Sequence, residues 1–372
     1  MAPTASLPET HTVLVQEVKG QPLIVKDQAT PCATPGSAVV KSLSVPILSY
    51  TREVLDGTRP TYAYPTPFVP GSSAIGRVIA TGADAVKLKQ GDLVLIESVV
   101  RGRDDEEEIF LLGLTHTGTS GTKKLMEGEW RNGTFAEYTK VPLEKCYVLN
   151  ETRLCRELGY NIDQLGWILK GLVPYGGFRS INLLPSESVI IAPASGGFGS
   201  AAVIVALAMG ARVIAMARKP EELKNMKALD PNRIETVPII GNVDDELVAL
   251  KKLGRINAFL DISPAAAQNS THFKSAILSS AHGSRVSLMG GLNDDLPVPH
   301  RFIMRRDILL KGKWMYNRED IVSFMQLLES GILNVKDIVK VIGKFALADW
   351  KEALDVAFDV GGRSGQLVVF NP

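Results

Sequence analysis

The second half of the chain alternates between short apolar runs and stretches in which apolar residues recur at helical spacing. Leu165, Ile168 and Leu172 fall on one helical face and predict a helix over residues 164–184. The run 188–193 is apolar and short, which is typical of a strand buried on both faces. The alternation predicts a parallel, doubly wound α/β sheet. Its predicted strands are 188–193, 212–217, 237–240, 258–262, 284–288 and 309–313, and its predicted helices are 200–209, 221–228, 244–253, 270–279 and 318–330.

The first 150 residues show a different pattern, with β-branched runs separated by Gly, Pro and Asp. Short strands at such spacing predict a small barrel, with strands at 13–18, 38–45, 73–81, 93–99 and 134–142. Sequence typical of β-strands returns near the C-terminus, and this segment is expected to complete the first domain. The predicted division is therefore 1–160 and 333–372 for one domain and 161–332 for the other.

Residues 101–132 interrupt the strand pattern and contain an acidic run at 104–108. The segment is expected to be a long surface excursion. A solvated loop and a lid or recognition loop are the two alternatives, because long loops in compact domains are often functional.

Composition excludes several classes of protein. The chain has 372 residues, with 41 Lys and Arg against 40 Asp and Glu, so its net charge of +1 gives no strong electrostatic case for nucleic acid or an anionic membrane. The three cysteines form no C-x-x-C pair, which suits a reducing compartment. Residues 1–9 lack the basic and apolar regions of a signal peptide. A cytoplasmic protein is the expectation.

The most informative motif is the glycine cluster that follows the apolar run 188–193. Glycine at 196 lets a backbone approach a pyrophosphate, and glycine at 199 lets a helix pack close to the strand. The helix that follows presents free N–H groups and a positive dipole end to phosphates. Ala194 stands where the G-x-G-x-x-G template has its first glycine. Nucleotide binding is predicted, with a purely structural turn as the alternative, and the predicted contact residues are Ser195, Gly196, Gly197, Phe198 and Gly199.

The end of the second strand predicts which dinucleotide binds. NAD-specific sites place an Asp or Glu there for the ribose 2′-hydroxyl. This chain has Ala217, followed by Arg218 and Lys219. A small apolar residue leaves room for a 2′-phosphate and two cations would neutralise it, so the predicted cofactor is NADP(H). Ordinary solvated charges after a strand are the alternative.

These motifs resemble those of the medium-chain dehydrogenase/reductase superfamily, in its zinc-independent quinone- and enoyl-reductase-like branch. The resemblance covers nearly the whole chain. It implies a GroES-like β-barrel catalytic domain and a Rossmann domain with a doubly wound parallel sheet. The segments that carry it are 69–76, 91–94, 133–138, 194–199 and 361–369.

At the positions where zinc members of that superfamily have their metal ligands, this chain has other residues. Ungapped matching puts Leu48 at the catalytic Cys position and Ser72 and Ser73 at the His-Glu pair. Leucine offers no ligand, and serine hydroxyls are poor zinc ligands. The segment 101–132 contains no cysteine for a structural zinc lobe. No metal site is predicted.

The resemblance also implies roles for other residues. Tyr50 falls at the proton-relay Ser/Thr position and is the candidate acid, with Ser49 and Tyr62 beside it. An amphipathic residue at a domain edge is the alternative for each tyrosine. Ile262 is expected under the cofactor ribose, and the backbone of Met289 and Gly290 beside the nicotinamide carboxamide. The run 174–177 is expected to form a turn whose glycines widen the substrate site.

Three functions follow from this set of expectations. The main hypothesis is zinc-independent, NADP(H)-dependent hydride transfer to an activated alkene (enone, enoyl or quinone), with secondary metabolism as a plausible setting. A carbonyl reductase or alcohol dehydrogenase is the alternative. A non-redox isomerase, cyclase or cofactor-binding partner protein is a further one. The expected partner is a small-molecule substrate, and a homodimer through Rossmann residues 297–310 is a further expectation.

Overall fold

The structure is a computed structural model that describes residues 7–360 and 365–372. It divides into two compact units. The N-terminal unit holds residues 7–169, 335–360 and 366–372, and the central unit holds residues 170–334 with Gly365. The start of the chain, residues 1–6, and the first part of the predicted C-terminal motif, residues 361–364, lie outside the described residues. No helix in the described part is long and apolar enough to cross a membrane.

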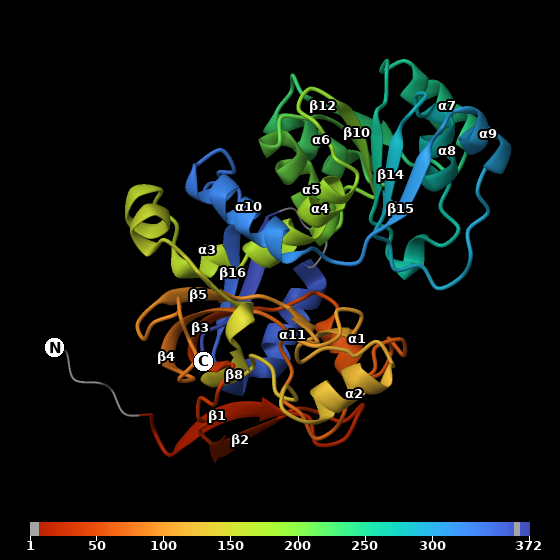
Figure 1. Cartoon of the computed structure of the whole chain (residues 1–372). Coiled ribbons are helices and arrows are strands. Elements are labelled where there is room, and N and C mark those ends of the chain that lie inside the picture. The colour runs from red at the N-terminus through yellow and green to blue at the C-terminus, as the bar shows by residue number, and fades with distance from the viewer. Residues whose placement is uncertain (1–6, 361–364) are drawn as a thin grey trace. The chain divides into compact units, whose positions relative to one another are not determined.

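Six parallel strands form the sheet of the central unit, which Figure 1 shows in green to blue. They are β10 (Ser188–Ala192), β11 (Arg212–Ala217), β12 (Ile234–Pro238), β13 (Ala258–Asp261), β14 (Arg285–Leu288) and β15 (Leu309–Gly312). Their order is β12-β11-β10-β13-β14-β15, so the chain winds outward from β10 to one edge and then from β13 to the other. The predicted doubly wound sheet is confirmed. In such a sheet the ligand crevice lies at the carboxyl ends of the strands, where the order reverses between β10 and β13.

Helices connect these strands and cover both faces of the sheet (Figure 1). They are α4 (Ile168–Ser180), α5 (Gly197–Ala208), α6 (Pro220–Leu229), α7 (Val243–Lys251), α8 (His272–Ser279), α9 (His300–Arg305) and α10 (Arg318–Glu329). Helices α7 and α8 pack against each other. Phe259 of β13 and Phe273 of α8 belong to one buried apolar cluster with Ile190 and Ile214. This burial drives the sheet and its helices to assemble, because apolar area leaves water.

The N-terminal unit is built on a seven-stranded sheet that is mainly antiparallel, with the order β16-β17-β3-β4-β5-β9 and β8 paired to β3. Its other elements include two short ribbons, β1-β2 and β6-β7. The strands are β1 (Thr10–Val15), β2 (Ile24–Ala29), β3 (Ser37–Pro46), β4 (Ala74–Thr81), β5 (Leu93–Ile96), β6 (Val99–Arg101), β7 (Ile109–Leu111), β8 (Tyr138–Pro142), β9 (Cys146–Val148), β16 (Lys340–Phe345) and β17 (Gln366–Phe370). The helices are α1 (Thr51–Leu55), α2 (Ser120–Glu127), α3 (Ile162–Leu165), α11 (Trp350–Val360) and a π-helical segment at Thr152–Glu157.

The segment 101–132 is more ordered than the predicted surface excursion. It contains β7 and the helix α2, and the acidic run lies at the turn between β6 and β7. The last residue of that run, Glu108, accepts a hydrogen bond from the Thr122 backbone N–H at 2.7 Å and another from the Thr119 hydroxyl. A carboxylate at a helix start satisfies free N–H groups and favours the helix dipole. The prediction of a loop throughout was therefore wrong: α2 has its own N-cap, Thr119, and Glu108 of the hairpin adds a second acceptor for the Thr122 N–H.

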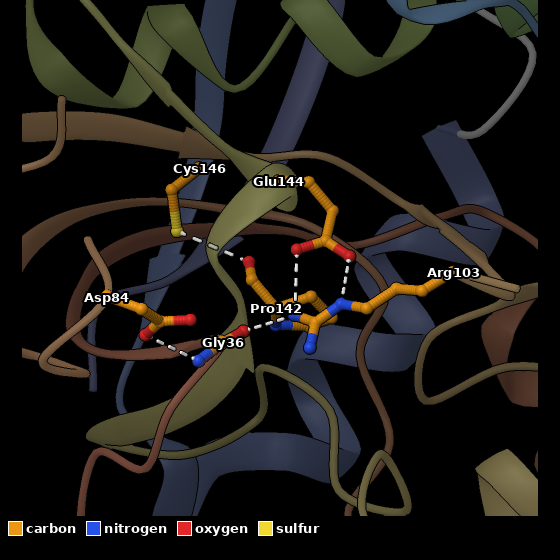
Figure 2. A network of polar contacts seen from close by, with 6 residues as sticks. All are labelled: Gly36, Asp84, Arg103, Pro142, Glu144 and Cys146. Carbon is orange, nitrogen blue, oxygen red and sulfur yellow. Dashed lines mark hydrogen bonds and ion pairs between the residues drawn. The ribbon is translucent and has the colours of Figure 1, made fainter. Parts of the chain in front are cut away.

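Figure 2 shows how a second residue of this segment ties neighbouring loops together. The Arg103 guanidinium donates to both carboxylate oxygens of Glu144, at 2.8 and 2.9 Å, and also to the carbonyl oxygen of Gly36. Gly36 adopts a φ of +77°, and a Cβ there would lie 2.2 Å from an Arg103 nitrogen. The positive φ is what favours glycine here, since the Arg103 guanidinium is the end of a flexible side chain and could move away from a Cβ. Asp84 holds the same loop by accepting from the Gly36 N–H at 2.7 Å.

The helix predicted over 164–184 is shorter in the structure. Helix α4 ends at Ser180, and Asn182 takes a φ of 51°. A left-handed residue stops a helix, and asparagine adopts this conformation more readily than most residues. The predicted strand 237–240 is also displaced: β12 begins at Ile234 and ends at Pro238.

Candidate functional site

The turn after β10 presents the amino end of α5 at the carboxyl edge of the central sheet. The α5 N-cap is Gly196, which makes no side-chain cap, and the first turn contains no acidic residue. Within the described part of the chain, the backbone N–H groups of Gly197, Phe198 and Gly199 have no hydrogen-bond partner. Free N–H groups and a positive dipole end fit a phosphate. The helix begins at Gly197, three residues before the predicted start at 200, because the glycines themselves form its first turn.

The two glycines of this turn differ in what surrounds them. A Cβ on Gly199 would lie 2.1 Å from the carbonyl oxygen of Pro193, so this glycine brings the helix close to the strand. A Cβ on Gly196 would meet nothing within 4 Å, and the residue is exposed. Ser195 beside it is half-buried. The turn therefore leaves open space at the helix start, which fits the pyrophosphate of a dinucleotide.

The next strand in the sheet, β11, ends in a buried Ala217 followed by two exposed cations. The side chains of Arg218 and Lys219 make no hydrogen bond or ion pair with any described residue. Lys219 is also the N-cap of α6 and makes no side-chain cap there. Since β11 and β10 are neighbours, these cations and the glycine turn share one edge of the sheet.

The predicted residues after β13 and β14 lie at the same edge. The Ile262 N–H donates to the Ala192 carbonyl of β10 at 3.0 Å, and the Met289 N–H donates to the Asp261 carbonyl of β13 at 2.9 Å. Gly290 is exposed, while Ile262 and Met289 are half-buried. The structure thus brings all four predicted cofactor-binding stretches together along the carboxyl ends of β11, β10, β13 and β14.

A buried polar chain under these loops was not predicted. The Ser263 hydroxyl donates to Asp261 Oδ1 at 2.6 Å and lies 2.9 Å from His272 Nε2, while His272 Nδ1 lies 2.6 Å from the Ser270 hydroxyl. Asp261, Ser263 and His272 are each at most 3% exposed. The sequence contains one signal for this cluster, an Asp as the last residue of an otherwise apolar strand.

The residues predicted for catalysis lie in the N-terminal unit, at the start of α1. Tyr50 is the residue before this helix, and its ring lies 5.7 Å from that of Tyr62 and 4.8 Å from the Arg59 guanidinium carbon. Burial raises the pKa of Tyr50 well above its usual value, and Tyr62 adds to this by its charge and a hydrogen bond, while Arg59 opposes it. The phenol is therefore a neutral hydrogen-bond donor at physiological pH. Ser49, next to it, is half-buried.

Tyr64, which belongs to the same segment, has a different role. Its hydroxyl donates to the Val54 carbonyl at 3.1 Å, and its ring stacks on Phe68 with centroids 4.5 Å apart. Burial raises the pKa of Tyr64 to about 12. Because its proton is already donated to the backbone, Tyr64 holds α1 in place.

The expectation for the run 174–177 was wrong. These residues lie inside α4 and form no turn. A Cβ on Gly176 would lie 2.6 Å from the carbonyl oxygen of Met315, and one on Gly177 would lie 2.3 Å from the sulfur of Met289. The missing side chains let neighbouring segments pack closely against the helix, so they do not widen a substrate site.

Two family models match the chain. Residues 34–152 match the alcohol dehydrogenase GroES-like domain, and residues 197–330 match the zinc-binding dehydrogenase family. An L-threonine 3-dehydrogenase of Streptomyces avermitilis is 27% identical over 96% of this chain and 98% of its own length. An NAD-dependent alcohol dehydrogenase of Sulfolobus acidocaldarius is 26% identical over 94% and 96%. A thermostable alcohol dehydrogenase of Pyrobaculum aerophilum has the same fold, with a TM-score of 0.72 at 19% identity over 98% of this chain and 100% of its own.

The chain belongs to the medium-chain dehydrogenase/reductase superfamily. It is an oxidoreductase with a GroES-like unit and a Rossmann unit, as predicted. Membership implies a nicotinamide cofactor, and the open helix start of α5 fits the phosphates of one.

Zinc is the second group that this superfamily implies, and here the residues do not fit. Leu48 offers no ligand, and the Ser73 hydroxyl donates to the Ile96 carbonyl at 2.6 Å. Leu48 and Ser72 line a cavity of about 10 Å³ whose walls include Phe68 and Phe135. Among the residues that the structure describes, no group of three His, Cys, Asp or Glu could hold a metal ion. A leucine and two serines stand where zinc members have their ligand set, while metal-free catalysis itself stays a prediction.

Proposed function

We propose that the chain is an NADP(H)-dependent oxidoreductase that interconverts a carbonyl group and an alcohol without a metal ion. The observation that carries this proposal is the neutral phenol of Tyr50, held beside Tyr62 and Arg59. The dehydrogenase names of the curated relatives support alcohol chemistry over alkene reduction. The substrate is a small ketone or aldehyde in one direction and the matching alcohol in the other.

In the proposed reaction the chain positions its ligands and moves one proton. When bound, the reduced coenzyme would supply a hydride for the carbonyl carbon. As charge develops on the carbonyl oxygen, the Tyr50 hydroxyl donates its proton there. The raised pKa keeps that proton on the phenol until a stronger base, the nascent alkoxide, takes it.

The preference for NADP(H) rests on the end of β11. Ala217 leaves out the carboxylate that would bind a 2′-hydroxyl and repel a 2′-phosphate. Arg218 and Lys219 are exposed, and neither pairs with a described residue, so both are available to a phosphate. Guanidinium and ammonium groups are the side chains that bind such a dianion best.

The coenzyme preference is tested by calorimetric titration of the purified chain with NADPH and NADH. A double variant, Arg218→Ala with Lys219→Ala, is expected to weaken NADPH binding by about tenfold or more and NADH binding by less than about twofold. The matched control replaces Lys251 and Lys252, two exposed lysines at the carboxyl end of α7, which leads to the opposite edge of the sheet. Equal losses for both coenzymes would contradict the preference.

Reduction of an activated alkene is the second candidate. The residues Leu48, Ser72 and Ser73 at the zinc-ligand positions favour it, because they would not hold the metal ion that stabilises an alkoxide. Incubation with NADPH and an enone separates the two by product: a saturated ketone supports alkene reduction, and an unsaturated alcohol supports the carbonyl proposal. The assay is run with and without a chelator. Activity abolished by the chelator would overturn the metal-free part of both candidates.

A further inference from the structure

Asp261 occupies a special position among the buried acidic residues of the central unit. It is the last residue of β13, next to β10, where the strand order reverses. Its side chain is 5% exposed, and among the described residues no Lys or Arg is paired with it; the nearest ring nitrogen, His272 Nε2, lies 3.6 Å from Oδ1. A carboxylate is costly to bury unless hydrogen bonds compensate, so the partners of its two oxygens show what it does.

One oxygen is held by a chain of three side chains. Since the Ser263 hydroxyl donates to Asp261 Oδ1, it accepts from His272 Nε2–H, which leaves His272 Nδ1 to accept from the Ser270 hydroxyl. Each bond in this chain is between 2.6 and 2.9 Å. The chain fixes the rotation of the carboxylate about its own axis.

The other oxygen, Oδ2, has no hydrogen-bond partner among the described residues. Glycine at 290 keeps the approach to it clear: a Cβ there would lie 2.7 Å from Oδ2 and 3.0 Å from the Ser263 backbone nitrogen. The backbone conformation at position 290 does not require glycine, because its φ lies outside the left-handed region. The open side of the carboxylate therefore coincides with a position where any side chain would collide with it.

Glu246 shows how a purely structural carboxylate is satisfied in the same unit. Its Oε1 accepts from the Ile240 and Gly241 N–H groups and from Thr271, and its Oε2 accepts from Ser275. Both oxygens are used, and the residue is 1% exposed. Asp261 is held as firmly on one side but keeps an acceptor for a group that the chain does not supply.

We propose that Asp261 Oδ2 accepts a hydrogen bond from a hydroxyl of the nicotinamide-side ribose, and that Ser263, His272 and Ser270 are positioning residues for that carboxylate. The assignment rests on the proposed coenzyme orientation, with the pyrophosphate at α5 and the 2′-phosphate at Arg218. Those contacts lie at β10 and β11, and β13 is on the opposite side of β10. The second ribose then reaches β13, about 10 Å from β11 at two strand spacings.

The charge of Asp261 decides which group can face it. A carboxylate repels a phosphate and attracts a donor, and a ribose presents hydroxyl donors. The pyrophosphate itself is placed at the helix start one strand away, where free N–H groups neutralise it.

Calorimetric titration of Asp261→Asn tests the proposal. The amide oxygen still accepts from Ser263, but a donor replaces the free acceptor Oδ2. We expect NADPH to bind roughly tenfold to a hundredfold more weakly, and 2′,5′-ADP, which carries only the adenine half, to bind within about twofold of the wild type. A purely structural role of Asp261 would leave NADPH binding unchanged, or would weaken both ligands alike, and either result overturns the proposal.

Glu187→Gln is the matched control, since it neutralises a largely buried carboxylate of the same unit that pairs with Arg285 and precedes β10, at the opposite edge of the sheet from Asp261. It is expected to leave both affinities within about twofold of the wild type. Should Asp261→Asn fail to fold, Gly290→Ala provides the test, because its methyl group closes the approach to Oδ2. It is expected to show the same selective loss of NADPH, and unchanged NADPH binding by Gly290→Ala overturns the proposal.

The proposed preference for NADP(H) can be wrong while the role of Asp261 is right, and the experiment distinguishes the two. If the wild type binds NADH and not NADPH, the role of Arg218 and Lys219 is wrong, and Asp261 is then tested with NADH against ADP as the adenine half. A selective loss of NADH in Asp261→Asn supports the ribose contact even in that case.

Discussion

Tyr50 is the residue on which the proposed chemistry depends most. Tyr50→Phe removes only the hydroxyl, so we expect turnover in carbonyl reduction to fall about a hundredfold while NADPH affinity is unchanged. Because the pKa of Tyr50 is raised well above its usual value, its deprotonation should cause no loss of rate below about pH 10. The control is Tyr64→Phe, whose hydroxyl is bonded to the backbone. A Tyr50→Phe enzyme with full turnover would remove this residue from the mechanism.

Lys145 makes stability depend on pH. It is 1% exposed, its ammonium nitrogen has no hydrogen-bond partner among the described residues, and burial lowers its pKa from 10.5 to about 8, with Glu97 opposing the shift. Below pH 8 Lys145 is protonated in both the folded and the unfolded chain, and the buried charge lowers the free energy of unfolding. Between about pH 8 and 10.5 the unfolded chain binds more protons, so stability rises with pH.

Lys145→Met should remove this cost. We expect it to raise the free energy of unfolding at pH 7 by up to about 3 kcal/mol, and by much less at pH 10. Urea denaturation of both proteins at the two pH values measures the difference. A gain that is equal at both would show that packing, and not the charge, is responsible.

At the scale of elements, the amino end of α8 is held by two carboxylates from other elements. Glu246 of α7 accepts from Thr271 and Ser275, and Asp261 of β13 reaches His272 through Ser263. We expect Glu246→Gln to lower the free energy of unfolding by about 1–3 kcal/mol, since one amide cannot accept all four bonds. Glu235→Gln, which loses an exposed ion pair with Lys227, should change it by about 1 kcal/mol or less.

Elements that depend on local sequence were predicted more accurately than elements that depend on contacts between distant residues. Buried strands such as β10 and β11 were predicted within about one residue, because their apolar runs are local. The helix α2 was missed although Thr119 is a local N-cap, because its sequence has few apolar residues and part of its support, Glu108, comes from a separate hairpin. The glycines 176 and 177 were placed in a turn because only tertiary packing shows what fills the space beside them.

For the whole molecule, the prediction still to be tested is a homodimer through residues 297–310. Within the part of the chain that the structure describes, β15 pairs only with β14, and Met304 of α9 and Leu309 of β15 are 59% and 50% exposed. An unpaired edge with apolar side chains beside it favours pairing with a second copy. Light scattering should give twice the chain mass for the wild type and the single mass for Met304→Asp. Val86→Asp, at an exposed position of the N-terminal unit, should stay dimeric.

The sequence by itself determined the doubly wound sheet and the glycine turn after its first strand, and it carries the predictions of a phosphate site there and of the loss of the zinc ligands. Each of these depends on residues adjacent along the chain or on the identity of a side chain. The tertiary structure alone decided that Asp261, His272 and Gly290 meet, that Tyr50 lies against Tyr62, and that Leu48 packs in an apolar wall. Such contacts join residues from different strands and helices, and local patterns of hydrophobicity carry no information about which of them become neighbours.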